Sequence, residues 1–325
     1  MGEWKRLPFG IDLGSTRLRL AFGERNRAGS VRLRAVVTRE LPDGAVTPTT
    51  VEAPQLVAAV AEEALSEIGT RERRCVLALG APAAAVRAIR FPKMSWAERM
   101  RAARFEARRF CDWNLDEEAS LVRSHPFDRA NGTFMVGAVR ASSVASRVAA
   151  LRATGLRIVA IDHDALAMQR LFAPCNAVAD VGFERSSLHV FGESGPRTLV
   201  TSAGGATISR GIAADLAIDL PTAERRKRIL GCAGAGAAAR EEFVAQLRAL
   251  VDRARSRTAI DRIVMTGNGA RLPNLARDVE AATGAIVEIP VPELLRCGSY
   301  PEDVVRAAAP DWSLAAALLT WDLPA

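Results

Sequence analysis

The chain has 325 residues, of which 49% are hydrophobic and 25% charged, the balance of a folded protein rather than a disordered one. This length exceeds what one small core usually serves, so we expect two lobes of ordinary domain size. The chain lacks the start of a secretory signal and has no run of about 18–20 apolar residues, so neither a leader nor a membrane span is expected.

The first 80 residues predict a sheet-forming lobe. Residues 9–12 are a short apolar run, and beyond Gly14 the apolar residues at 18, 20 and 22 alternate with polar ones, as in a strand. This pattern predicts a hairpin. A strand over 31–37, an amphipathic helix over 54–69 and a buried strand over 76–79 follow.

Residues 81–160 predict a compact α+β unit inserted between two larger parts. Strands are expected over 85–91, 121–126, 133–140 and 156–161, with a second helix over 142–154. The first helix is expected to run from Ser95 to about residue 110, because Ser95 and Glu98 have the spacing of a capping box.

Residues 161–325 predict a second lobe. A helix over 162–172 precedes strands over 176–182 and 187–191, which again flank a short polar turn. Helices over 206–218, 222–230 and 239–257, strands over 261–265 and 285–289, and a closing helix over 312–321 complete the chain. Such alternation of strands and helices is typical of a mixed α/β fold.

The cysteine and arginine patterns do not indicate a metal, redox or nucleic-acid site. The cysteines are Cys75, Cys111, Cys175, Cys232 and Cys297. They form no CxxC pair and no zinc spacing with the three histidines, so we interpret them as thiols in a reducing compartment. The net charge of +7 comes almost entirely from arginine, clustered at 71–74, 99–109 and 225–228. No nucleic-acid motif accompanies these clusters, which favours solvated helix faces over a nucleic-acid surface.

Two turns repeat an Asp-x-Gly motif, with Asp12 and Gly14 in the first and Asp180 and Gly182 in the second. Backbone N–H groups of a tight turn bind phosphate well, and glycine permits close approach. Further donors to phosphate are predicted at Ser15, Thr16, Arg19 and Ser186 (or Ser187), and at Gly204 and Gly205, which open a helix. The two aspartates are predicted to hold Mg²⁺ through water. An ordinary hairpin explains one such turn, but two copies favour a phosphate site.

A third motif follows the predicted strand at 261–265. Gly267, Asn268, Gly269 and Ala270 allow backbone to lie flat against an adenine or ribose face. The alternative is an ordinary strand–helix turn.

In this order the three motifs resemble those of the actin-like ATPase superfamily, and over most of the chain the sequence resembles the PilM family. The similar segments are 10–21 (GIDLGSTRLRLA), 86–110, 136–168 and 261–273 (DRIVMTGNGARLP). Arg19 stands where that family usually carries Lys. Asn268 stands where it usually carries Gly, and Asn tolerates a left-handed backbone. The resemblance implies a two-lobed α/β fold, actin-like and ribonuclease-H-like, with an inserted α+β subdomain: 1–80, 81–160 and 161–325, the last helix closing back on the core.

The resemblance also implies a function. It predicts a cytoplasmic scaffold of the type IV pilus inner-membrane assembly platform, which binds ATP and Mg²⁺ and reaches the membrane only through a partner. That partner is the N-terminal tail of a PilN-like bitopic membrane protein, in a groove near residues 85–170. Self-association is a further expectation, and nucleic-acid binding is not expected.

Turnover is expected to be weak at most. By resemblance, Asp164 occupies the position of an acidic group that orients the attacking water, with a helix cap as the alternative. Two other functions stay open, a filament-forming FtsA-like ATPase and a GspL-like secretion component. The first requires a C-terminal amphipathic membrane helix. The second requires a following transmembrane segment.

Overall fold

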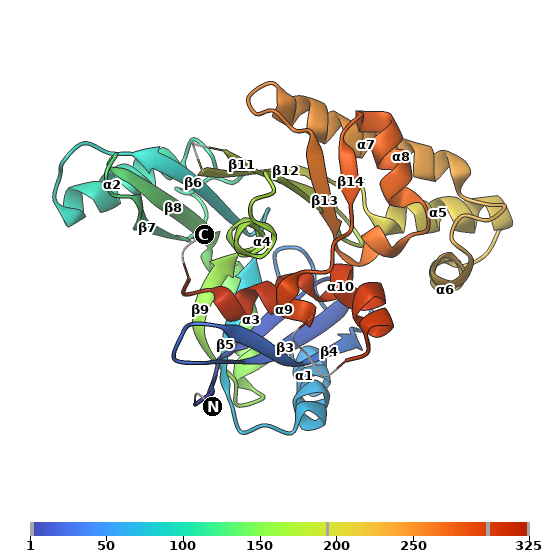
Figure 1. The fold of residues 1–325 in the computed structure, drawn as a ribbon, viewed down its shortest axis with the longest axis horizontal. Coiled ribbons are helices and arrows are strands. Elements are labelled where there is room, and N and C mark those ends of the chain that lie inside the picture. Colours follow the sequence, from blue (N-terminus) through green and yellow to red (C-terminus); the bar gives the residue numbers. More distant parts are fainter. Residues whose placement is uncertain (1–2, 193–194, 297–299, 324–325) are drawn as a thin grey trace.

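A computed structural model describes residues 3–192, 195–296 and 300–323. It contains two large β-sheets with their helices, called lobe 1 and lobe 2 below, and a smaller inserted sheet that projects from lobe 1 (Figure 1).

Lobe 1 is built on a six-stranded sheet. Its strands are β1 (Lys5–Arg6), β2 (Phe9–Leu13), β3 (Arg17–Arg25), β4 (Val31–Glu40), β5 (Arg74–Leu79) and β9 (Arg157–His163). Helices α1 (Pro54–Ile68) and α3 (Ala141–Arg152) cover one face, where they bury Ile11 and Leu20. Because successive strand side chains point to opposite faces, Asp12 and Arg19 lie on the other face, toward lobe 2.

Lobe 2 is built on a five-stranded sheet. Its strands are β10 (Ala177–Val181), β11 (Ser186–Gly192), β12 (Gly195–Thr201), β13 (Arg262–Thr266) and β14 (Ile286–Glu288). Its helices are α5 (Gly205–Leu216), α6 (Leu220–Leu230), α7 (Ala237–Arg255) and α8 (Leu275–Thr283), with a 3₁₀ turn η1 (Asn268–Arg271). The core under α5, α7 and α8 takes Ala179 and Val181, which leaves Asp180 on the face toward lobe 1.

The two large sheets repeat one topology, which confirms the predicted duplication. In each, an antiparallel run of three strands (β4-β3-β2 and β12-β11-β10) continues into two parallel strands (β5-β9 and β13-β14). Both hairpin turns are closed by the same bond. The N–H of Gly14 donates to the carbonyl of Arg17, and that of Gly182 to the carbonyl of Arg185, each at 3.0 Å.

Two helices lie between the sheets, α4 (Asp164–Phe172) and α10 (Glu302–Ala317) (Figure 1). Met168 of α4 packs on lobe 2, whereas Ala167 packs on Val76 of lobe 1. The short helix α9 (Glu293–Arg296) precedes α10, and η2 (Leu318–Thr320) follows it. The predicted closing helix is therefore present, but it begins ten residues earlier than expected and contains Pro310.

The inserted sheet consists of β6 (Ala84–Arg90), β7 (Ser120–Asp128) and β8 (Thr133–Arg140), covered by α2 (Trp96–Ala107). The capping box at the start of α2 is confirmed, since Glu98 accepts the Ser95 N–H at 2.8 Å and Ser95 accepts the Glu98 N–H at 3.3 Å.

The packing differs from the predicted boundary of this unit at residue 160. β9 pairs with β5, and Leu151 of α3 lies in the lobe 1 core. Both elements therefore pack with lobe 1, because Leu151 of α3 and Ile158 of β9 contact the core under α1.

Candidate functional site

A cavity of about 360 Å³ lies between the two lobes, where the β2–β3 turn and the β10–β11 turn both reach it. Its size is in the range of small-molecule sites. The predicted residues that line it are Asp12, Gly14, Ser15, Thr16, Arg19, Asp164, Asp180, Gly182, Gly205, Gly267, Asn268 and Gly269. The fold thus brings all three motifs to one cavity, and their binding roles stay predictions.

Three of the predicted residues do not line the cavity. Ser186 is buried and its hydroxyl donates to the carbonyl of Ala203 at 2.9 Å, while the neighbouring Ser187 faces the cavity. Ala270 is buried in the lobe 2 core. Gly204 supports the second turn, because a Cβ at this position would lie 2.4 Å from the carbonyl oxygen of Phe183.

Arg19 lines the cavity, but its guanidinium is held by two carboxylates. Its Nη1 lies 2.8 Å from Asp12 Oδ2, and its Nε and Nη2 donate to Asp311 Oδ1 of α10 at 2.9 and 2.6 Å. Burial lowers the pKa of Arg19, but the two carboxylates outweigh burial and raise it overall. Burial also raises the pKa of Asp12, which the charge of Arg19 only partly offsets. Arg19 therefore ties α10 to the first turn.

Two further carboxylates, Asp180 and Asp164, face the cavity with opposite electrostatics. Burial, reinforced by the charges of Asp12 and Asp164, raises the pKa of Asp180 to about 7. Burial also opposes ionisation of Asp164, but the nearby His163 and the backbone N–H of Ala165 hold its pKa well below the usual range. Asp164 is therefore ionised at neutral pH.

The side chain of Asp164 is positioned by the residues on either side of it in the sequence. Its Oδ1 lies 2.8 Å from His163 Nδ1 and accepts the N–H of Ala165 at 2.7 Å. His163, not Asp164, is the N-cap residue of α4. On the other side lies Gly80, where a Cβ would come within 1.6 Å of Asp164 Oδ2, so only glycine leaves room for this carboxylate.

The third motif contacts the second turn rather than open space. A Cβ at Gly267 would lie 2.4 Å from Asp180 Oδ1, and one at Gly269 would lie 2.3 Å from Val181 Cγ1. These glycines are therefore required by the close approach of β10. Asn268 lies in η1 with a right-handed backbone, so this position does not need the left-handed conformation that Asn tolerates. Its Oδ1 accepts a hydrogen bond from Arg17 Nη1 at 3.1 Å, across the two lobes.

The sequence analysis did not predict several charged residues that line the cavity: Arg17, Arg147, Arg185, Glu224, Lys227 and Asp311. Lys227 is buried, with its Nζ 2.7 Å from both the Gly205 carbonyl and Glu224 Oε2. The composition offered one signal for Lys227, because it is one of only three lysines among 44 lysines and arginines. Asp311 gave a weaker signal, a lone acid in an apolar stretch.

The described residues include no group of three His, Cys, Asp or Glu side chains arranged to hold a metal ion directly. The described cysteines are free, and none lines the cavity. Burial raises the pKa of the Cys75 and Cys111 thiols to about 12, which fits inert thiols, and Cys297 lies outside the described residues. Within the described ranges, no helix is long and apolar enough to cross a bilayer.

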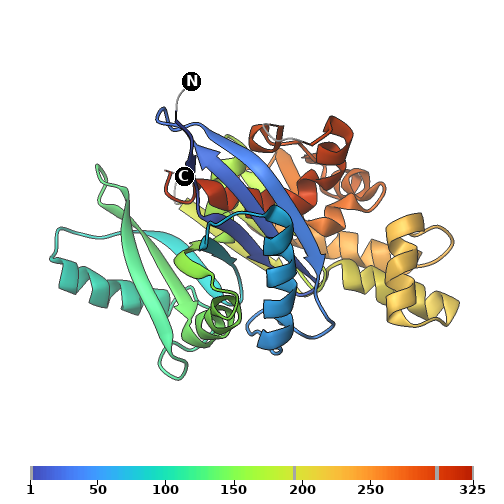
Figure 2. The same cartoon turned by 90° about the horizontal axis from the view of Figure 1, so that it is seen from below.

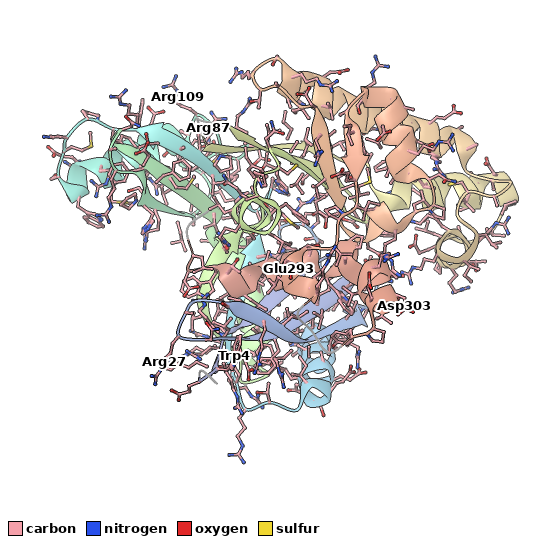
Figure 3. All side chains as sticks on the ribbon, viewed as in Figure 1. Trp4, Arg27, Arg87, Arg109, Glu293 and Asp303 are labelled. Atoms are coloured by element: carbon pink, nitrogen blue, oxygen red, sulfur yellow. The ribbon has the colours of Figure 1, made fainter. Side chains whose placement is uncertain are left out.

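The arginine clusters do not converge on one face. The cluster at 99–109 is on α2 and the cluster at 225–228 is on α6, and these helices lie at opposite ends of the molecule (Figures 1 and 2). Arg109 at the inserted sheet and Arg27 on lobe 1 are likewise far apart (Figure 3). This distribution agrees with solvated arginines rather than a single basic surface.

Two sheets of one topology, with paired turns at a shared cavity, define an actin-like fold, and comparison with solved structures confirms it. MreB5 of Spiroplasma citri bound to ADP is 12% identical, with a TM-score of 0.51 over 90% of this chain and 94% of that one. The ethanolamine utilization protein EutJ of Carboxydothermus hydrogenoformans is 13% identical, with a TM-score of 0.61 over 97% and 89%.

A closer likeness is to a chain in a structure of the PilM–PilN type IV pilus biogenesis complex. It is 25% identical, with a TM-score of 0.83 over 96% of this chain and 97% of that one. The sequence model of the family "Type IV pilus assembly protein PilM" matches residues 10–318, so the chain belongs to this family. The search of curated protein sequences gave no match. Neither the FtsA-like nor the GspL-like alternative is better supported.

Proposed function

We propose that this chain is a nucleotide-binding scaffold of the type IV pilus assembly platform. It takes ATP with Mg²⁺ between its lobes and docks the N-terminal tail of a PilN-like membrane protein, through which it reaches the cytoplasmic face of the inner membrane. The observation that carries this proposal is the match to a chain of the PilM–PilN complex over 96% of this sequence.

The cavity has the donors that a nucleotide requires. The turns closed by Gly14 and Gly182 reach the cavity from both lobes, and we assign the remaining N–H groups of these turns to phosphate. The helix α5 begins at Gly205 on the same cavity, where the N–H of Gly205 already donates to the carbonyl of Gly182. Lys227 and Asn268 line the cavity from lobe 2.

Asp12 and Asp180 fit Mg²⁺ held through water, since hard cations prefer carboxylate oxygens and Mg²⁺ keeps several waters. When bound, the ion would neutralise phosphate charge. Asp180 must then give up its proton, which its pKa of about 7 allows near neutral pH. Asp164 is ionised and can accept a hydrogen bond from a water, which supports at most slow hydrolysis.

Calorimetry with ATP and ADP in the presence of Mg²⁺ tests the nucleotide site. Asp12→Ala removes one carboxylate from the cavity and is expected to weaken ATP binding about tenfold or more. The exposed Asp43→Ala in lobe 1 is the matched control and should bind like the wild type. Wild-type protein that binds neither nucleotide would contradict the proposal.

The docking surface proposed for the peptide is the free edge of β9. Among the described residues β9 pairs only with β5, and it leaves Val159 and Ile161 39% and 37% exposed. The inserted sheet lies beside this edge (Figure 1), with Leu121 and Phe127 of its own edge strand β7 also exposed. An extended peptide can add to such an edge through main-chain hydrogen bonds. Its apolar side chains would then contact the exposed apolar side chains of β9 and β7.

A synthetic peptide with the cytoplasmic N-terminal sequence of the cognate PilN-like protein tests this surface. Ile161→Lys is expected to weaken peptide binding about tenfold and leave ATP binding unchanged. The control is Ile286→Lys on β14, the equivalent edge strand of lobe 2, where Ile286 is 52% exposed. If both variants lose the same peptide affinity, or if neither variant loses any, the peptide does not bind at the edge of β9.

A further inference from the structure

Two arginines line the cavity without a carboxylate partner among the described residues. Arg147 comes from α3 of lobe 1 and Arg185 from the end of the second turn in lobe 2, and both line the cavity. Among the described residues neither makes an ion pair, although most cavity cations do, including Arg17, Arg19 and Lys227.

Arg147 is 3% exposed and is held by carbonyl groups alone. Its Nη1 donates to the carbonyls of Thr49 and Ser143 at 3.0 and 3.2 Å, and its Nη2 to those of Pro48 and Thr47 at 3.2 and 3.4 Å. Its Nε is buried and has no hydrogen-bond partner among the described residues. Burial, together with the charge of Arg185, lowers the pKa of Arg147 to about 10.

Arg185 occupies the position in the second turn that Arg17 occupies in the first, since each supplies the carbonyl that closes its turn. Their side chains differ. Arg17 bonds to Asn268 and lies 3.5 Å from Asp311. Arg185 has no ion-pair partner within the described ranges, and its Nη1 is buried without a hydrogen bond there. Asp164 and Asp180 attract Arg185 from beyond ion-pair distance.

Most charges of the cavity are paired with each other, as Arg19 is with Asp12 and Asp311. Arg147 and Arg185 have no such partner among the described residues, so they are suited to an anion from outside the chain. Buried cations without a counterion are costly unless a ligand neutralises them. A phosphoryl group has three acceptor oxygens, enough to accept from the unpaired Nε of Arg147 and from the guanidinium of Arg185 together.

We propose that Arg147 and Arg185 form an anion clamp that holds the terminal phosphate of a bound nucleoside triphosphate between lobe 1 and lobe 2. The clamp rests on the proposed nucleotide site and adds to it a means of distinguishing triphosphate from diphosphate. It also connects that distinction to the inserted sheet, because α3 follows β8 without a break. The triphosphate neutralises both arginines and draws the lobes together, whereas the diphosphate leaves them repelling each other.

The test compares ADP with a non-hydrolysable ATP analogue by calorimetry in Mg²⁺. In Arg185→Met the affinity for the analogue should fall about tenfold or more, while the affinity for ADP changes less than about twofold. Arg253→Met, an exposed arginine of α7 in the same lobe, is the matched control and should keep the wild-type ratio. Beryllium fluoride, a phosphate mimic, should tighten ADP binding in the wild type but not in Arg185→Met. If the methionine variant does not fold, Arg185→Gln carries the same measurement.

Equal loss of both nucleotides in Arg185→Met would overturn the clamp, because the arginine would then act on the inner phosphates or on the fold. Unchanged binding of both would overturn it as well. Wild-type protein that binds neither nucleotide removes the proposed nucleotide site itself, and the clamp with it, so the two failures are distinguishable.

Discussion

Asp311→Ala tests whether the contact of α10 with the first turn stabilises the closed arrangement of the molecule. Asp311 is 4% exposed and accepts two hydrogen bonds from Arg19, at 2.9 and 2.6 Å. Removing one partner of a buried ion pair usually costs about 3–5 kcal/mol, and Arg19 keeps Asp12, so we expect a loss near the lower end, about 3 kcal/mol. With an unfolding entropy of about 2.1 cal/mol/K per residue, this loss lowers the melting temperature by about 4 °C.

Urea denaturation followed by circular dichroism measures the change. The matched control is Asp322→Ala, because Asp322 also accepts two hydrogen bonds from one arginine, Arg25, each at 2.6 Å, but its side chain is 38% exposed. An exposed pair of this kind contributes about 1 kcal/mol or less. If the two alanine variants lose the same stability, burial does not decide the strength of these pairs and the reasoning fails.

Two other substitutions probe the carboxylates of the cavity. Gly80→Ala places a Cβ 1.6 Å from Asp164 Oδ2 and should destabilise the fold by about 2 kcal/mol in thermal denaturation. The control is Gly137→Ala, whose Cβ would lie 3.7 Å from Val86 Cγ1, and this variant should be nearly as stable as the wild type. For Asp180, the folded pKa is raised from 3.8 to about 7, so the unfolded chain loses this proton first and folding stability falls as pH rises between those values. Asp180→Asn removes that loss and should be more stable than the wild type at pH 8, by about 4 kcal/mol, but not at pH 4. Denaturation without nucleotide at both pH values checks this, and an equal difference at both would contradict the raised pKa.

Local patterns in the sequence were sufficient for the two turns that reach the cavity. The short apolar strands beside Asp12 and Asp180 predicted both hairpins, and the fold brings both aspartates to one cavity. The strand Gly195–Thr201 was missed, because Pro196 and the glycine before it weaken a strand pattern. The first half of α10 was missed because Pro310 normally ends a helix. Its carbonyl instead accepts hydrogen bonds from the Gly267 N–H and the Thr266 hydroxyl, each at 2.9 Å.

Partners distant in sequence could not be predicted in this way. Arg19 was expected to face phosphate, but its main partner Asp311 lies 292 positions away. The same holds for Arg147 and Arg185, which line one cavity only because the fold brings α3 and the second turn to it. Charge alone does not say which cation is paired with a carboxylate and which is left for a ligand.

The position of α10 has a consequence for the order of folding during synthesis. The core of lobe 2 uses the continuous segment 177–287, whereas the α10 face of lobe 1 combines Leu7, Ala21 and Leu33 with residues 295–319. Lobe 1 therefore cannot bury that face until residues 295–319 leave the ribosome, and long-range closure of this kind is slow. We expect lobe 2 to fold first although it is synthesised second. Until then lobe 1 exposes one apolar face, to which chaperones can bind.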